Sequence, residues 1–338
     1  LAGNLCRCTG YKPIYIATKN MYSFGKFDHF SKNEKKIINK LKSIKQKGVE
    51  INLLKNKFFI PSNIEELKDN IKKFENFKYL SGGTDLALEI TKKRKSIESM
   101  IYLGNNNDLK YIKVDQNNIF IGSATPINDT LEILNKYYPS LVEMFLRYGS
   151  LQIRNVATIG GNIANASPIG DSSPALISLN ASIIIDGNKT RKIKLKDFFI
   201  KYKKTILEKN EFIKEIIIPI EKDSIFKCYK ISKRFDDDIS SVFMAINLKL
   251  KKQIINKISI TCGGMSEIPK KAINTENFLK RKKFNYDNIM TARTYLLKDF
   301  NPISDMRASK NYRKAIVQNL LIKFFHEIES KIQISVNL

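Results

Sequence analysis

The chain has 338 residues, of which 43% are apolar and 10% aromatic, a length and composition that suit two or three domains and exclude a disordered protein. It has no stretch of roughly 18 unbroken apolar residues that would span a membrane, and its four cysteines are too few for a disulfide scaffold. The formal net charge is +26, from 59 Lys and Arg against 33 Asp and Glu; because the excess is mostly dispersed lysine rather than clustered arginine, we expect no nucleic-acid partner.

The first 55 residues show few signs of compact structure. A tight turn at Cys6-Arg7-Cys8 precedes a short predicted helix at 14–22, and residues 23–55 are rich in Lys and Asn. We interpret 1–22 as the end of a domain and 23–55 as a linker, within which 35–44 has helical periodicity. The chain opens on Leu1 without a signal-peptide pattern, so we expect a fragment of a cytoplasmic protein with no membrane partner.

A folded unit is predicted over 56–221, in two parts that meet near residue 112. Pro61-Ser62-Asn63 precedes an acidic turn, which is typical of a helix N-terminus. An irregular stretch at 153–174, rich in Gly, Asn, Ser and Pro, is too long for an ordinary loop and therefore indicates function. The predicted elements are helices at 63–73, 86–92, 127–135 and 141–148, and strands at 77–80, 100–103, 119–122, 183–185 and 216–219.

A last folded unit is predicted over 222–332. Apolar residues recur at three- and four-residue spacing over 317–328, which predicts an amphipathic helix. The predicted elements are strands at 226–231, 242–250 and 256–262, followed by helices at 274–280, 286–296 and 309–330. Strands and helices are segregated in this way in the α+β class.

Two segments contain adjacent glycines. Residues 80–86 read Leu-Ser-Gly-Gly-Thr-Asp-Leu, which predicts a strand and a tight turn whose N–H groups form an anion-binding nest. Residues 154–165 contain the second pair, which predicts a second nest of the same kind, and continue to Asp171, whose carboxylate can accept hydrogen bonds from a ribose or ribityl hydroxyl. Either pair alone can be a plain turn, but together they suit a ligand with a diphosphate and a long polar chain held between two subdomains.

The cysteines and histidines give weaker signals. Cys6 and Cys8 form a C-x-C turn that can place two thiolates on a metal or cluster, and a structural or accidental pair is the competing interpretation. Cys228 and Cys262 lie in predicted strands and are interpreted as small buried apolar residues. The sequence has neither a Ser/His/Asp constellation nor an HExxH motif, so it gives no support for hydrolytic chemistry.

Several segments, in the same order, resemble xanthine dehydrogenases of the molybdenum hydroxylase flavoprotein family. Residues 4–11 resemble the end of the second 2Fe–2S domain, 80–86 and 152–171 resemble the two FAD-binding stretches, and 226–239 with 304–313 resemble the C-terminal flavoprotein domain. The combination is most similar to the small iron–sulfur/FAD subunit of the bacterial enzymes, shortened at its N-terminus.

The resemblance implies an α+β fold. It comprises a remnant of a helical 2Fe–2S domain at 1–22 and the linker at 23–55. A two-subdomain FAD-binding domain of the vanillyl-alcohol-oxidase/PCMH type follows at 56–221, and an α/β domain like the CO dehydrogenase flavoprotein C-terminal domain at 222–332.

The resemblance also implies a cofactor site. Lys78 and the turn after it would line the diphosphate and adenosine side of FAD, Tyr148 would lie beside the flavin ring, and the acidic loop 236–238 would neighbour the flavin. No side chain is expected to act as a catalytic acid or base. The implied FAD-binding residues are Lys78, Ser81, Gly82, Gly83, Thr84, Asp85, Leu86, Tyr148, Thr158, Gly160, Gly161, Asn162, Asp171 and Lys230. Cys6 and Cys8 would be an incomplete ligand set, so we expect no intact 2Fe–2S cluster in the chain as given.

The implied function is electron transfer during purine oxidation. Hypoxanthine or xanthine would be oxidised at molybdopterin in a partner large subunit, within a heterotetramer-type assembly, and electrons would pass through 2Fe–2S clusters to FAD and then as hydride to NAD⁺. Two alternatives remain open. The chain can be the medium FAD subunit of a related molybdenum hydroxylase that acts on CO, an aldehyde or an N-heterocycle, or it can be a non-functional fragment.

Overall fold

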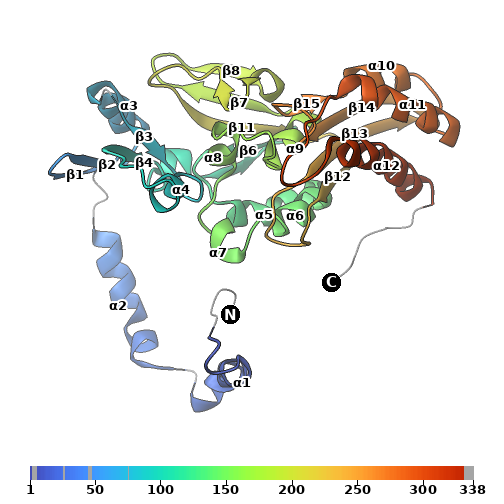
Figure 1. Ribbon diagram of the computed structural model, residues 1–338. Coiled ribbons are helices and arrows are strands. Elements are labelled where there is room, and N and C mark those ends of the chain that lie inside the picture. The colour runs from blue at the N-terminus through green and yellow to red at the C-terminus, as the bar shows by residue number, and fades with distance from the viewer. Residues whose placement is uncertain (2–5, 26, 45–47, 75, 331–338) are drawn as a thin grey trace.

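The computed structural model describes residues 1, 6–25, 27–44, 48–74 and 76–330. Its first elements are α1 (Lys12–Asn20), the 3-10 turn Met21–Phe24 and α2 (His29–Ser43), and neither helix contains a buried residue. Figure 1 shows both helices apart from the sheets. Part of the predicted linker is therefore helical, as its periodicity indicated. Residues 2–5 of the predicted 1–22 segment and the end of the predicted 222–332 domain lie outside the described residues.

The first sheet has the strand order β1-β2-β4-β3. Strands β1 (Val49–Leu53) and β2 (Asn56–Ile60) form an antiparallel hairpin, and β4 (Ser99–Tyr102) lies parallel to both β2 and β3 (Lys78–Leu80). The prediction that the linker extends to residue 55 is therefore wrong at its end, because residues 49–53 form strand β1 of this sheet. No turn motif marks this hairpin, because the turn residue Leu54, at φ 53°, takes a conformation that is usually marked by Gly or Asn.

Helices α3 (Ile64–Lys73) and α4 (Leu86–Thr91) accompany this sheet. The predicted N-terminus of α3 is confirmed, since the Asn63 side chain accepts a hydrogen bond of 2.8 Å from the Glu66 N–H. The apolar side of α3 packs on the sheet around Phe59, Leu67 and Ile101. This small layer places the turn after β3, which carries the first glycine pair.

The second sheet has the order β5-β6-β11-β7-β8. Three short helices occupy the stretch 153–174 and its borders, so the prediction of irregular chain there is corrected. The first two begin at side-chain caps, which Ser150 and Thr158 provide. The strands are β5 (Ile112–Val114), β6 (Asn118–Gly122), β7 (Ser182–Asp186), β8 (Arg191–Lys194) and β11 (Phe212–Pro219), with a small hairpin of β9 (Phe199–Lys201) and β10 (Lys204–Thr205). The helices are α5 (Ile127–Tyr137), α6 (Pro139–Leu146), α7 (Leu151–Arg154), α8 (Ile159–Ala164) and α9 (Ser172–Ser178).

The third sheet has the order β12-β13-β14-β15 and carries the last helices on one side (Figure 1). Its strands are β12 (Ile225–Ile231), β13 (Val242–Lys251), β14 (Ile254–Gly263) and β15 (Lys270–Lys271), and its helices are α10 (Ile273–Leu279), α11 (Tyr286–Asp299) and α12 (Lys310–Glu329). Arg313 of α12 is buried and donates to the Gly264 carbonyl at 2.9 Å and to Asp305 at 2.7 Å. In the described part of the chain, no helix is both long and apolar enough to cross a membrane. The mixture of sheets and helices confirms the predicted α+β class.

A buried carboxylate ties the first layer to the second sheet. Asp186, at the end of β7 and 1% exposed, lies 2.7 Å from the Lys68 ammonium of α3. Burial acts to raise the pKa of Asp186, but hydrogen bonds from Lys68, the Gly187 N–H and the Thr190 hydroxyl outweigh it and hold this pKa below its ordinary value. The carboxylate is therefore stabilised in its charged form by the two layers together.

Asp186→Asn is expected to lower the free energy of unfolding by about 1–3 kcal/mol at pH 7. Because the folded-state pKa is lowered, the carboxylate stabilises the fold above the unfolded-state pKa of about 3.9, and this contribution is lost as the pH falls through the folded-state value. Urea unfolding of the wild type and the variant at pH 7 and at pH 3.5 measures this contribution. The difference in free energy of unfolding between the two proteins should be smaller at pH 3.5. Asp197→Asn, whose side chain is 61% exposed, is the matched control. An equal loss of unfolding free energy in the Asp186 and Asp197 variants would contradict the stabilising role of the Asp186 carboxylate.

Candidate functional site

The first glycine pair makes a turn that touches the second glycine segment. Gly83 has a φ of 72°, a left-handed conformation that favours glycine. A Cβ on Gly82 would overlap the backbone of Val156 and Ala157, so only glycine permits this approach. The hydroxyls of Ser81 and Thr158 lie 3.1 Å apart across the same contact. The two segments predicted to hold one ligand are thus packed directly together.

The second glycine pair is helical rather than a nest. Gly160 and Gly161 lie in the first turn of α8, which Thr158 caps by accepting a hydrogen bond of 3.0 Å from the Gly161 N–H. A Cβ on Gly160 would overlap Ser123 at the end of β6. The prediction of a second curled turn is therefore wrong, because the Thr158 cap makes the segment helical and the glycine at 160 serves close packing.

A cavity of about 710 Å³ opens between these segments and the third sheet. Its volume lies within the usual range for sites that hold small molecules and cofactors. Every residue predicted to bind the cofactor lines it: Lys78, Ser81, Gly82, Gly83, Thr84, Asp85, Leu86, Tyr148, Thr158, Gly160, Gly161, Asn162, Asp171 and Lys230. The structure thus brings together residues that are up to about 150 positions apart in the chain.

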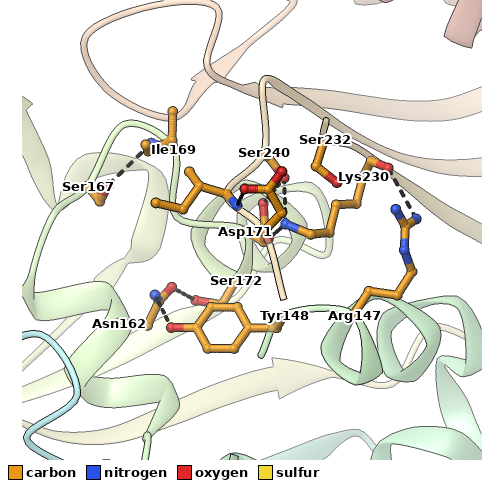
Figure 2. A network of polar contacts seen from close by, with 12 residues as sticks. Arg147, Tyr148, Asn162, Ser167, Ile169, Asp171, Ser172, Lys230, Ser232 and Ser240 are labelled. Atoms are coloured by element: carbon orange, nitrogen blue, oxygen red, sulfur yellow. Dashed lines mark hydrogen bonds and ion pairs between the residues drawn. The ribbon is translucent and has the colours of Figure 1, made fainter. Parts of the chain in front are cut away.

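A buried ion pair forms one wall of the cavity. Figure 2 shows Lys230, Asp171 and Ser240 converging. The Lys230 ammonium lies 2.7 Å from Asp171 Oδ2 and donates to the Ser240 hydroxyl at 3.0 Å, while that hydroxyl donates to Asp171 Oδ1 at 2.6 Å. Asp171 is 3% and Lys230 4% exposed. Both Asp171 oxygens are thus engaged within the protein, whereas the sequence led us to expect them to accept from a ligand. A buried carboxylate needs such a partner.

A second polar network joins this wall to an aromatic side chain. Asn162 donates to the Tyr148 hydroxyl at 2.9 Å, and Ser172, the neighbour of Asp171, donates to the Asn162 carbonyl oxygen (Figure 2). Burial raises the pKa of Tyr148 to about 12, so its hydroxyl keeps its proton at neutral pH. The ring is therefore held in one place as a neutral surface at the cavity.

The acidic loop predicted to neighbour the site is anchored from α6. The Arg147 guanidinium donates to the Lys230 carbonyl at 3.1 Å and to the Phe235 carbonyl at 3.0 Å, and it lies 4.2 Å from the centre of the Phe235 ring. Asp238 lines the cavity, and a hydrogen bond from the Arg234 N–H lowers its pKa. Arg147 was not identified from the sequence, because an arginine that ends a helix has no local signature.

Other cavity residues were also missed from the sequence. They are Tyr79 on β3, Ser123 after β6 and Glu211 just before β11. Glu211 is paired with Arg191 at 2.7 Å. Tyr79 and Ser123 sit in ordinary strand patterns, so no motif marks them.

The cysteines fall into two groups. The Cys6 and Cys8 sulfurs lie 3.4 Å apart, and hydrogen bonding with Thr9 lowers the pKa of Cys6 to about 7. Cys262 is buried, as interpreted from the sequence, whereas Cys228 is only half-buried and its thiol donates to the Ser140 carbonyl at 3.0 Å. Burial raises the pKa of the Cys228 thiol to about 12 and that of Cys262 well above its usual value. Among the described residues, no group of three or more His, Cys, Asp and Glu side chains is placed to hold a metal ion.

Both folded parts match known protein families. Residues 52–221 match the FAD binding domain in molybdopterin dehydrogenase, and residues 227–328 match the CO dehydrogenase flavoprotein C-terminal domain.

Two relatives and one solved structure illustrate the likeness. The glyceraldehyde dehydrogenase medium chain of Sulfolobus acidocaldarius is 31% identical over 270 residues, which are 78% of this chain and 96% of that one. A xanthine dehydrogenase of Oryza sativa subsp. japonica is 27% identical over 99% of this chain but only 30% of its own length. The carbon monoxide dehydrogenase from Hydrogenophaga pseudoflava has the same fold, with a TM-score of 0.75 and 22% identity over 81% of this chain and 96% of that one. The chain thus spans nearly all of a medium chain and less than a third of the xanthine dehydrogenase.

Lys230→Met is expected to destabilise the protein by about 3–5 kcal/mol, because the Asp171 carboxylate is left buried without its cation. Adding Asp171→Asn to this variant should recover part of the loss, since no unpaired charge then remains. Denaturant unfolding of the single and double variants measures both effects. Lys227→Met, on the same strand and half-buried, is the control, and a Lys230 variant as stable as this control would refute the assigned role.

Proposed function

The chain belongs to the family of FAD-binding domains of molybdopterin dehydrogenases, and we propose that it is the FAD-carrying electron-transfer subunit of a molybdenum hydroxylase. The observation that carries this proposal is the single cavity that gathers both glycine segments, Tyr148 and Lys230. FAD requires room for a dinucleotide, close approach of the backbone to its diphosphate, and a flat apolar surface for its ring. Each requirement has a counterpart among the residues that line the cavity.

The residues at the cavity fit FAD. The turn at Gly82 and Gly83 brings backbone to the cavity surface, and a Cβ on Gly161 would meet only the Thr158 hydroxyl oxygen, at 2.9 Å, so the rest of its surroundings is open. The buried hydroxyl of Ser123 has no hydrogen-bond partner among the described residues, which suits a site completed by a polar ligand. We propose that the residues 78–86 hold the diphosphate and adenosine half, and that Tyr148, Asn162 and Lys230 hold the flavin half.

The work of this chain is binding and positioning. FAD, when bound, supplies two-electron chemistry that includes hydride transfer to NAD⁺. Lys230 places a fixed positive charge, oriented by Asp171 and Ser240, at the cavity wall. Tyr148 contributes a neutral ring held by Asn162, and Arg147 anchors the loop that carries Asp238. This positioning requires no proton transfer by a protein side chain.

We propose more specifically that the electrons come from a xanthine dehydrogenase-type reaction. The likeness to xanthine dehydrogenase extends over the N-terminal residues, which hold Cys6 and Cys8, whereas the likeness to the medium chain covers a smaller share of the chain. Two thiolates are half of a four-cysteine ligand set for a 2Fe–2S cluster, so the other ligands would come from sequence outside this chain. A partner subunit would carry molybdopterin and oxidise the purine.

The second candidate function is that of a medium FAD subunit in an aldehyde-oxidising enzyme. It is favoured by the higher identity to the glyceraldehyde dehydrogenase medium chain and by the coverage of nearly the whole of that chain. The two candidates share the FAD site and differ in the partner's substrate.

The purified chain, supplied with FAD, is expected to show the absorption bands of oxidised flavin, and anaerobic NADH should bleach them. Bleaching would place nicotinamide within reach of the flavin. Bands that persist with NADH but bleach with dithionite would contradict NAD⁺ as the acceptor and leave the FAD site intact. A protein that takes up no FAD would overturn the proposed function.

The complex isolated with its partner subunits is expected to reduce NAD⁺ with xanthine or hypoxanthine and not with glyceraldehyde. The reason is that the partner's molybdenum site selects the substrate, whereas this chain receives only electrons. Steady-state NADH formation with each substrate, against a matched sample without substrate, measures the choice. Turnover with glyceraldehyde but not with purines would replace the first candidate by the second.

A further inference from the structure

A strongly basic surface with exposed apolar side chains lies where α4 ends and the β9–β10 hairpin turns back. Within residues 86–95 and 199–205, seven cations stand against a single carboxylate, that of Glu89. We name this surface the basic patch. Its cations are Lys92, Lys93, Arg94, Lys95, Lys201, Lys203 and Lys204, and its exposed apolar residues are Leu88, Ile90, Ile200 and Tyr202.

The two segments of the basic patch are far apart in the chain but close in the fold. A hydrogen bond from Lys93 to Glu89 raises the pKa of Lys93, and Tyr202 on the hairpin lies near enough to add a smaller effect. Leu86 and Glu89 of α4 also line the same cavity as Leu207, which follows the hairpin. The cations of the two segments therefore contribute to one local field.

The charges of the basic patch are not balanced among the described residues. There, only Lys93 has an ion-pair partner, Glu89 at 3.0 Å. Lys201 and Lys204 lie directly opposite each other on the two hairpin strands, and like charges at such positions destabilise a strand pair. Lys203, between them, has a φ of 52°, which a residue other than glycine adopts less readily. Lysines that cost the hairpin stability in this way suit an anionic partner that compensates them.

Exposed apolar side chains stand among these cations. Tyr202 is 58% and Ile200 51% exposed on the hairpin, and Leu88 and Ile90 of α4 are 44% and 48% exposed. Tyrosine is enriched where a bilayer meets water, because its ring is apolar and its hydroxyl is polar. The stem of a lysine can lie along apolar surface while its ammonium reaches a phosphate. The basic patch thus has both components of a peripheral contact with anionic lipid.

We propose that the basic patch docks on a bilayer surface that contains anionic phospholipid, with the β9–β10 hairpin at the headgroups. Six of its seven cations are lysines, which lack the planar fork that suits nucleic acid, and lysine is depleted in interfaces between proteins. The sequence led us to expect no membrane partner, because it has neither a spanning stretch nor a signal peptide, but a peripheral contact requires neither. This docking is independent of the proposed function.

Binding of the full chain to lipid vesicles tests the docking. The chain should co-sediment about tenfold more with vesicles of equal parts phosphatidylglycerol and phosphatidylcholine than with phosphatidylcholine alone, and about 500 mM salt should abolish this preference by screening. Lys201→Gln combined with Lys204→Gln should weaken binding to the anionic vesicles about tenfold or more, since each lysine near such a surface strengthens binding about fivefold. The thermal stability of this variant should not fall, because two opposed like charges are removed.

Lys280→Gln combined with Lys283→Gln is the matched control, because it removes the same charge elsewhere. Both lysines are exposed and lie between α10 and α11, at the end of the molecule away from α4 (Figure 1). The control should bind the anionic vesicles as the wild type does. Equal weakening in the two double variants would overturn the docking site, because binding would then follow the net charge of the whole chain.

A fluorescent reporter tests the position of the hairpin. The chain contains no tryptophan, so the emission of Tyr202→Trp comes from one site and should shift to shorter wavelength on anionic vesicles. Tyr312→Trp, at a position on α12 that is 46% exposed, should show no shift. An unshifted Tyr202→Trp spectrum, or a wild-type chain that does not bind anionic vesicles at about 50 mM salt, would overturn the proposal. Tighter binding to double-stranded DNA than to vesicles at equal phosphate concentration, lost in the Lys201 and Lys204 variant, would also overturn it.

Discussion

The buried ion pair between Lys230 and Asp171 is the interaction on which the cavity depends. Its two members come from different folded parts, β12 of the third sheet and the residue before α9, and both are almost fully buried. Two charges removed from water remain stable only when they are paired and hydrogen-bonded. The Ser240 hydroxyl completes the pair, and it lies at the end of the loop that Arg147 anchors. The position of the cavity wall is therefore fixed by a requirement of electrostatics rather than by apolar packing alone.

The opposite wall depends on a steric requirement. Gly82 and Gly160 each allow a second backbone segment to approach where a Cβ would overlap it. The turn after β3, the end of β6 and the start of α8 are consequently stacked at one point, from three segments that are distant in the sequence. The Ser81 and Thr158 hydroxyls then meet across that contact. Glycine in these motifs serves the packing of protein on protein as well as the approach of a ligand.

The sequence predicts which residues line the cavity better than it predicts the contacts that hold them there. Adjacent glycines, Asp171 and Lys230 could be found because short motifs and a family resemblance mark them, and all of them line the cavity. The role of Asp171 could not, because its partner Lys230 is 59 positions away and pairing is a tertiary property. Strand β1 was missed because Leu54 replaces the expected turn glycine, and α8 because its glycines disfavour a helix that the Thr158 cap nevertheless supports.

The hydroxyl of Ser123, which has no hydrogen-bond partner among the described residues, connects binding to stability. A protein that buries polar groups without partners is less stable than its packing allows, and a ligand that supplies those partners stabilises the folded state in proportion to the logarithm of its concentration above its dissociation constant. In this fold the cavity is lined by residues of all three sheets or of the segments beside them, so a bound ligand would contact all three. The dinucleotide would then act as a third component of the interface, beside the Lys230–Asp171 pair and the glycine contact. On this argument, the residues that would hold the cofactor and those that hold the domains together form one set. Substitutions among them should change ligand affinity and unfolding free energy together. The exception is a group that has no partner in the ligand-free chain.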